Sequence, residues 1–332
     1  MSAEKIIADW KRKNFKPLYW LEGEEDYYID MVIDHAEHNI LSEAEAGFNL
    51  TVFYGKDAVW SEVLNACRRY PMFAERQVVL LKEAQHMKDI EKLEPYIENP
   101  LASTIFVVGH KEKTLDGRKS MSKLLKKNDA LFSFKKMYDN KLPEWTSELV
   151  QQKGYSISPK ATVLLVEHIG NDLSRIANEV DKVILNLGGQ KLITEDDIEK
   201  YVGVSKEYNV FELQDALGRK DLAKAIKIIQ YFESNPKAGP LQLVLPALYN
   251  YFSKAYMLFA VQGKDDKTAA ATIGVSPFFI KDYQVVARNY SYSGVEQALL
   301  LLHHYNLRGI GINDSGTAQG SLMKEMAVKL IS

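Results

Sequence analysis

The first residues that could do chemistry follow the apolar run Leu18–Leu21, in the stretch LEGEEDYY. A nucleotide-binding P-loop occupies this kind of position and needs Gly-x-x-x-x-Gly-Lys-Ser/Thr, because its backbone amides contact phosphates and its lysine neutralises them. Here Gly23 is followed by Glu24, Glu25 and Asp26, without a lysine or a hydroxyl. Three carboxylates repel a triphosphate but suit the start of a helix. The sequence therefore predicts that this loop binds no nucleotide.

Cysteine and histidine mark neither a metal site nor a catalytic nucleophile. The single cysteine, Cys67, excludes a disulfide framework or a cysteine-based zinc site within one chain. His35 and His38 are three residues apart on a predicted helix and could share a metal, but a solvated helix face also has this spacing. The sequence has no His-Glu-x-x-His and no Gly-x-Ser-x-Gly motif. We predict no catalytic residue, no metal and no cofactor.

Two large apolar residues, Met72 and Phe73, stand together in the stretch Tyr70-Pro71-Met72-Phe73. Pro71 ends the preceding helical pattern, so the two residues fall on a loop. They can fold back onto the core as a packing plug. They can also project as a wedge into a pocket of a partner, because Met and Phe are common interface anchors. The residues alone leave both interpretations open.

Basic residues crowd the segment Lys111–Lys127, where helical spacing places several lysines on one face: Lys119, Lys123, Lys126 and Lys127. This face can simply be solvated, or it can contact DNA phosphates. The 332-residue chain as a whole has 42 Lys and Arg against 44 Asp and Glu. Its net charge of -2 excludes a histone-like binder that depends on a global positive field.

The elements that must position these residues alternate in the first part of the chain. Helical patterns separate five runs rich in Val, Ile, Phe and Tyr: Leu18–Leu21, Leu50–Tyr54, Val78–Leu81, Thr104–Val108 and Leu131–Phe134. Strand and helix alternation is typical of a parallel α/β sheet, and several runs are continuously apolar, as in strands buried on both faces. We predict an α/β domain over residues 1–140.

The remaining chain is predicted to be helical, without further strands. Residues 141–209 form a small helical module, and residues 210–332 form a larger all-α domain. The expected helices of the larger domain are Phe211–Gly218, Leu222–Phe232, Pro240–Gln262, Lys267–Ile273, Pro277–Arg288, Val295–Leu307 and Ser321–Leu330. The glycine-rich stretch Gly309–Gly320 is expected to be a flexible turn between helices.

Neither export nor membrane insertion is predicted. Charges interrupt the N-terminal segment, and no run of about 18 apolar residues occurs. With one cysteine, these features favour a cytoplasmic location and no membrane partner.

Four stretches together resemble one family, the delta subunit of bacterial DNA polymerase III, which is part of the clamp loader. The similar stretches are Leu18–Asp34, Arg68–Ala84, Ile105–Lys127 and Gly170–Asp221. The last is the most specific, with GNDL, NEVDK and NVFELQDA in the family's order. The resemblance extends over nearly the whole chain.

This resemblance implies an AAA+/RecA-like domain without a nucleotide site, a small helical lid domain and a helical collar domain for oligomerisation. It implies a non-catalytic component of the polymerase III holoenzyme that binds the sliding clamp and holds the ring open for loading onto primed DNA. The implied partners are the clamp, subunits of the gamma/tau and delta-prime types, and DNA through the assembled complex.

The resemblance also assigns a role to the loop of apolar residues. It implies that Met72 and Phe73 enter a hydrophobic pocket of the clamp, while Tyr70 and Pro71 shape the loop. Met72 stands where the family usually has leucine, and the two side chains are similar in volume. Two alternatives remain: a nucleotide-using AAA+-type ATPase, and a stand-alone DNA-binding protein that uses Lys111–Lys127.

Overall fold

The computed structural model describes residues 2–261, 263–314 and 316–332. It divides into two compact units, residues 1–137 and 138–332. The predicted domain boundaries at residues 140 and 209 remain predictions. None of the helices in the described ranges is both long and apolar enough to cross a membrane.

The first unit contains a five-stranded sheet in which every pair of neighbouring strands is parallel. The spatial order is β2-β3-β4-β1-β5, and the strands are β1 (Leu18–Gly23), β2 (Leu50–Tyr54), β3 (Gln77–Lys82), β4 (Thr104–Lys111) and β5 (Leu131–Phe134). All five predicted apolar runs form strands. The prediction of a parallel α/β sheet is therefore confirmed.

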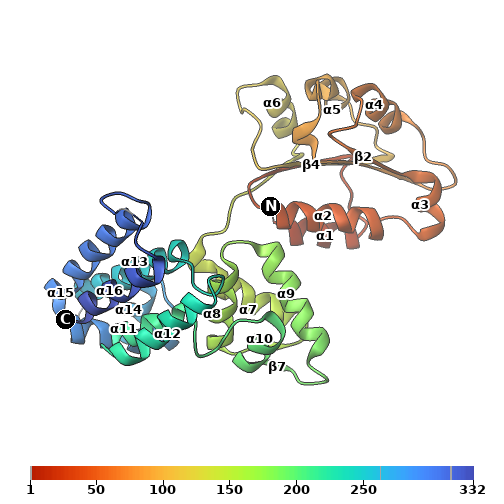
Figure 1. Cartoon of the computed structure of the whole chain (residues 1–332). Helices are drawn as coiled ribbons and strands as arrows, with labels where there is room; N and C mark the ends of the chain where they lie inside the picture. Colours follow the sequence, from red (N-terminus) through yellow and green to blue (C-terminus); the bar gives the residue numbers. More distant parts are fainter. Residues whose placement is uncertain (1, 262, 315) are drawn as a thin grey trace. The chain divides into compact units, whose positions relative to one another are not determined.

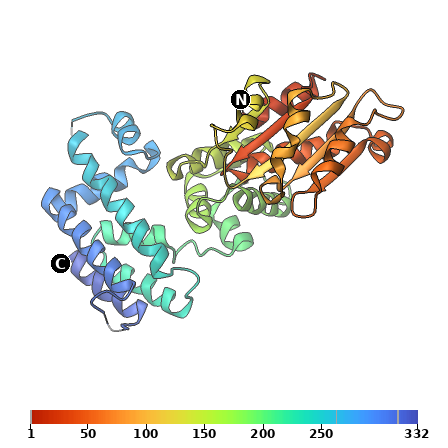
Figure 2. The same cartoon turned by 90° about the horizontal axis from the view of Figure 1, so that it is seen from above.

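Helices cover both faces of this sheet (Figures 1 and 2). One face packs on α1 (Ala3–Lys11) and α2 (Asp26–Asn39), and the other packs on α4 (Trp60–Arg68), α5 (Glu94–Glu98) and α6 (Ser120–Lys127). Successive strand residues point to opposite faces, so Val78 joins the first core and Val79 the second. Three short helices complete the unit: α3 (Glu43–Asn49), η1 (Ala84–His86) and η2 (Ile90–Leu93).

The second unit is mainly helical. Its helices are η3 (Asp139–Lys141), α7 (Leu142–Gln152), α8 (Pro159–Ile169), α9 (Leu173–Asn186), α10 (Glu195–Val202), α11 (Val210–Gly218), α12 (Leu222–Ser234), α13 (Leu241–Leu258), η4 (Phe259–Val261), α14 (Asp266–Ile273), η5 (Pro277–Phe279), α15 (Ile280–Gly309) and α16 (Gln319–Ile331). The predicted helix Pro240–Gln262 corresponds to α13 and η4, and Gln262 itself lies outside the described residues.

The prediction of no further strands was wrong. Two short strands, β6 (Ser156–Ile157) and β7 (Leu192–Ile193), pair in parallel. Hydrogen bonds from the Ser156 amide to the Lys191 carbonyl (2.8 Å) and from the Ser158 amide to the Ile193 carbonyl (2.9 Å) hold them together. Two residues are too few to show an alternating pattern, so periodicity could not detect them.

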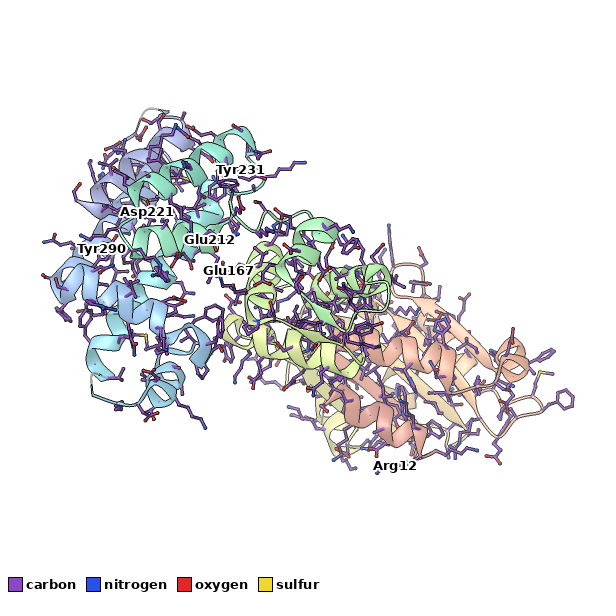
Figure 3. All side chains as sticks on the ribbon, turned by 90° about the horizontal axis from the view of Figure 1, so that it is seen from below. Arg12, Glu167, Glu212, Asp221, Tyr231 and Tyr290 are labelled. Atoms are coloured by element: carbon purple, nitrogen blue, oxygen red, sulfur yellow. The ribbon has the colours of Figure 1, made fainter. Side chains whose placement is uncertain are left out.

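The two predicted helices Pro277–Arg288 and Val295–Leu307 fall largely within α15, on either side of a break. Ser291 interrupts the helical backbone there with φ 58° and ψ 175°. Just before the break, the Tyr290 hydroxyl donates to the Leu217 carbonyl at 2.7 Å and anchors α15 on α11 (Figure 3). Figure 3 also labels Glu212, whose carboxylate accepts from Lys224 at 2.5 Å and ties α11 to α12.

Candidate functional site

The loop between the end of α4 and the start of β3 projects the apolar residues that the sequence singled out. Phe73 is 96% exposed, Tyr70 77% and Met72 54%, while Pro71 is partly exposed. Because neither Met72 nor Phe73 is covered by the core, the interpretation of a packing plug was wrong. Neighbouring exposed apolar side chains form the kind of patch that is typical of interaction sites.

Buried polar side chains fix the base of this loop. The side-chain amide of Gln77 lies 3.1 Å from the Ala66 carbonyl and 2.5 Å from the Arg69 carbonyl, to which it donates. The Thr104 hydroxyl donates to the Cys67 carbonyl at 2.9 Å. Ala66 and Cys67 belong to the last turn of α4 and Arg69 follows it directly, where a helix offers few amide donors to its carbonyls. The point at which the chain leaves α4 is therefore fixed from strands β3 and β4.

A second polar side chain, Asn49, holds the tip. The Met72 amide donates to Asn49 Oδ1 at 2.7 Å, and Asn49 Nδ2 donates to the Met72 carbonyl at 2.9 Å. Asn49 is the last residue of α3 and is only 3% exposed. Both backbone polar groups of Met72 thus bind one buried side chain.

Phe73 follows this fixed residue in a left-handed backbone conformation, with φ 55°. Such a conformation is uncommon for a residue with a Cβ atom. Beyond it, the Arg76 guanidinium lies 5.3 Å from the centre of the Phe15 ring. The loop therefore leaves α4 and enters β3 at defined points and presents apolar side chains at its tip.

The loop after β1, where a P-loop would lie, has its backbone amides already engaged. The amides of Glu24 and Glu25 both donate to the Phe134 carbonyl, at 3.0 and 3.3 Å. Gly23 has φ 132°, and a Cβ atom there would lie 2.0 Å from the same carbonyl oxygen. These amides point at a neighbouring strand and not at an open anion site.

Two carboxylates of this region, Glu22 and Glu25, are buried, whereas Glu24 is exposed. Glu25 is buried, accepts a hydrogen bond from the Met137 amide at 3.3 Å, and lies 3.9 Å from the Lys136 ammonium. Burial raises the pKa of Glu25 above its usual range. Glu22 accepts from the Leu115 amide at 2.9 Å. This arrangement disfavours a bound triphosphate.

The basic segment divides into two kinds of side chain. The four lysines predicted to contact phosphate are all exposed: Lys119, Lys123, Lys126 and Lys127. Lys119 immediately precedes α6, and the other three lie on it. Lys111 differs, because its ammonium lies 2.7 Å from Asp30 and 2.8 Å from Glu83. Burial alone would lower the pKa of Lys111. The hydrogen bonds to these two carboxylates and their negative charges together outweigh burial, so the pKa lies above its usual value.

The two histidines considered as metal ligands have other neighbours. The His35 ring stacks on Trp10 with ring centres 6.0 Å apart, and His38 Nδ1 lies 3.0 Å from the Asp34 carbonyl oxygen. Within the part of the chain that the structure describes, no three or more His, Cys, Asp or Glu side chains are grouped so that they could hold a metal.

The residues that shape the loop, Asn49, Gln77 and Thr104, were missed by sequence reasoning. Each is a polar residue beside an apolar run, which is also where an ordinary surface residue stands. The only available signal was the position of Gln77 and Thr104 as the first residues of buried strands.

The chain is similar to proteins of one family in sequence over most of its length. Residues 19–135 match the model of the family described as DNA polymerase III, delta subunit. The chain is 25% identical to the DNA polymerase III subunit delta of Bacillus subtilis, over 96% of this chain and 93% of that protein. It is also 25% identical to a probable DNA polymerase III subunit delta of Aquifex aeolicus, over 80% of this chain and 77% of that protein.

A solved structure shares the fold. The Bacillus subtilis DNA clamp loader delta protein (YqeN) superposes with a TM-score of 0.53 at 23% identity, and the match covers 99% of both chains. These comparisons confirm the resemblance predicted from the sequence. The parallel sheet followed by helices also fits the predicted AAA+-like fold class.

Proposed function

Because the chain is a delta-type subunit of DNA polymerase III, a non-catalytic component of the clamp loader in DNA replication, we propose that it binds and opens the sliding clamp. The contact is the loop Tyr70–Phe73, with Met72 and Phe73 inserted into a hydrophobic pocket of the clamp. One observation carries this proposal: Phe73 is 96% exposed on a loop whose neighbouring residue is fixed by a buried side chain.

The energy available from such a contact is sufficient for a transient partner. Burial of both side chains contributes on the order of 3–6 kcal/mol before ordering costs are subtracted. The hydrogen bonds from Asn49 reduce those ordering costs, because they order the backbone before the clamp binds. The ring opens if the open clamp binds this surface better than the closed clamp does.

The remaining parts of the chain have supporting roles in this proposal. Residues 210–332 form the collar that joins subunits of the gamma/tau and delta-prime types. Lys119, Lys123, Lys126 and Lys127 contact phosphates of primed DNA in the assembled loader. The subunit uses no cofactor or metal of its own and acts in the cytoplasm, where the clamp and the DNA meet.

The direct test is binding of the purified chain to the sliding clamp of the same organism, without ATP. We expect the double variant Met72→Ala/Phe73→Ala to weaken binding by about 100-fold, which corresponds to roughly 3 kcal/mol. Phe278→Ala is the matched control, since it removes another exposed phenylalanine from the second unit. Circular dichroism checks that each variant is folded.

Equal binding by the wild type and the double variant would place the clamp contact elsewhere. If neither binds, the assembled loader is tested in the same way, and a failure there would contradict the clamp-opening role. Saturable micromolar binding of a fluorescent ATP analogue with magnesium would support the ATPase alternative. Tight binding to DNA without the clamp, with steep salt dependence, would support the stand-alone DNA-binding alternative.

A further inference from the structure

We infer that Asn49 is the positioning residue of the clamp-binding loop, holding the Met72 peptide so that Phe73 is presented before the clamp arrives. This inference rests on the proposed function of the loop. Asn49 itself is buried and is not expected to touch the clamp.

The geometry of Asn49 is specific to one loop residue. Its Oδ1 accepts from the Met72 amide at 2.7 Å, while its Nδ2 donates to the Met72 carbonyl at 2.9 Å and to the Glu45 carbonyl at 3.1 Å. The first two bonds form a closed pair with both polar groups of Met72, much as one strand residue pairs with another. Asn49 and Met72 are 23 residues apart in sequence, so this link is tertiary.

The helix that carries Asn49 is itself fixed at its other end. Ser42 and Glu45 form a capping box at the start of α3, in which the Ser42 amide donates to the Glu45 carboxylate at 2.9 Å. The Glu45 carbonyl is in turn an acceptor for Asn49. A chain of hydrogen bonds therefore runs from the N-terminus of α3 to the tip of the loop.

The consequence for Phe73 follows from its backbone. A left-handed φ of 55° is unfavourable for phenylalanine, so a free loop would leave this conformation. With the preceding peptide held by Asn49, the loop keeps the conformation that exposes the ring. Without Asn49, the clamp would have to select that conformation from many, and the affinity would fall accordingly.

The test combines amide exchange with clamp binding. In Asn49→Ala, we expect the Met72 amide of the free protein to exchange at least 10-fold faster and the clamp affinity to fall by about 10-fold. In a background that already carries Phe73→Ala, the same substitution should change the affinity by less than 2-fold, because no ring remains to be positioned. A residue that supports only the overall fold would lower the affinity equally in both backgrounds.

Two further variants complete the design. Asn128→Ala is the matched control, because Asn128 also donates its side-chain amide to a backbone carbonyl, that of Ile97, at 2.7 Å, but away from the loop. Asn128→Ala should leave the exchange rate of the Met72 amide and the affinity for the clamp unchanged. Asn49→Ser keeps a polar group but is shorter, so its single hydroxyl cannot bond to both the amide and the carbonyl of Met72, and it should change the exchange rate and the affinity in the same direction as Asn49→Ala. If Asn49→Ala does not fold, Asn49→Ser carries the same test.

The inference is overturned if the Met72 amide exchanges at the wild-type rate in the Asn49 variants, or if their affinity loss is the same with and without Phe73. Failure of the proposed function looks different. If Phe73→Ala alone leaves clamp binding intact, the loop is not the clamp site, whatever the exchange rate of the Met72 amide.

Discussion

At the scale of single residues, buried polar side chains of the first unit hold the backbone of the loop that carries the exposed apolar side chains. Asn49, Gln77 and Thr104 are all buried, and each bonds to backbone atoms of the loop or of the helix that leads into it. The exposed residues Met72 and Phe73 make the contact that we propose. Their direction is decided by residues that never reach the surface.

Gln77 gives a prediction at this scale. Gln77→Leu should lower the free energy of unfolding by about 1–3 kcal/mol, because the carbonyls of Ala66 and Arg69 lose their buried donor. Urea unfolding followed by circular dichroism measures the change. Gln151→Leu is the control at an exposed position, and a loss of the same size there would show that the effect does not come from the lost hydrogen bonds.

At the scale of elements, the contact between α8 and the helices α13 and α15 includes a titrating group. Glu167, labelled in Figure 3, lines a cavity of about 150 Å³ together with Tyr251, Lys254 and Tyr283. Burial raises the pKa of Glu167 to about 7, although the positive charge of Lys254 lowers it. The carboxyl group is therefore half protonated near neutral pH in the folded chain.

The sign of the resulting pH dependence is fixed by this shift. Glu167 keeps its proton in the folded state up to pH about 7, whereas an unfolded glutamate loses it near pH 4.3. The contribution of Glu167 to stability is therefore present below about pH 4.3 and lost as the pH rises to 7. Between pH 5 and 8, the free energy of unfolding of Glu167→Gln should therefore exceed that of the wild type by on the order of 1–3 kcal/mol. Urea unfolding at several pH values checks this, and parallel curves would contradict it.

The helices and strands also show how much of the fold can be predicted from the sequence. Runs rich in Val, Ile, Phe and Tyr predicted all five strands of the main sheet, and several of these runs are continuously apolar, as in strands buried on both faces. Patterns of apolar spacing do not reveal β6 and β7, which are two residues each. They do separate two helices, Pro277–Arg288 and Val295–Leu307, on either side of the backbone break at Ser291 inside α15. The exposed pair Met72 and Phe73 was visible as a candidate, but the link to Asn49 was not, because it joins residues far apart in sequence by side-chain geometry alone.

At the scale of the whole molecule, each compact unit has its own core. The two faces of the sheet are closed by helices from residues 1–137 alone, and the largest cluster of the second unit lies within residues 210–332. All the residues that shape or support the proposed clamp contact belong to the first unit. If the proposed contact is correct, clamp binding should therefore be separable from the helical unit.

This separation predicts the behaviour of a fragment. Residues 1–137, expressed alone, should fold cooperatively and bind the clamp within about 3-fold of the affinity of the full chain, a difference of roughly 0.6 kcal/mol. Calorimetry and surface plasmon resonance measure the two quantities. A folded fragment that does not bind would mean that the second unit supplies part of the contact.

The carbonyl of Phe134 bears on how such a chain can evolve. It accepts the amides of Glu24 and Glu25, and it excludes any side chain at position 23. Substitution of the carboxylates by glycine and lysine would give the loop the residue types of a phosphate-binding motif. The amides at positions 24 and 25 would still donate to the Phe134 carbonyl of β5. Nucleotide binding would need changes both in the loop after β1 and in β5, and neither change would suffice without the other. The backbone geometry at Gly23 therefore opposes the acquisition of a phosphate-binding loop by single substitutions.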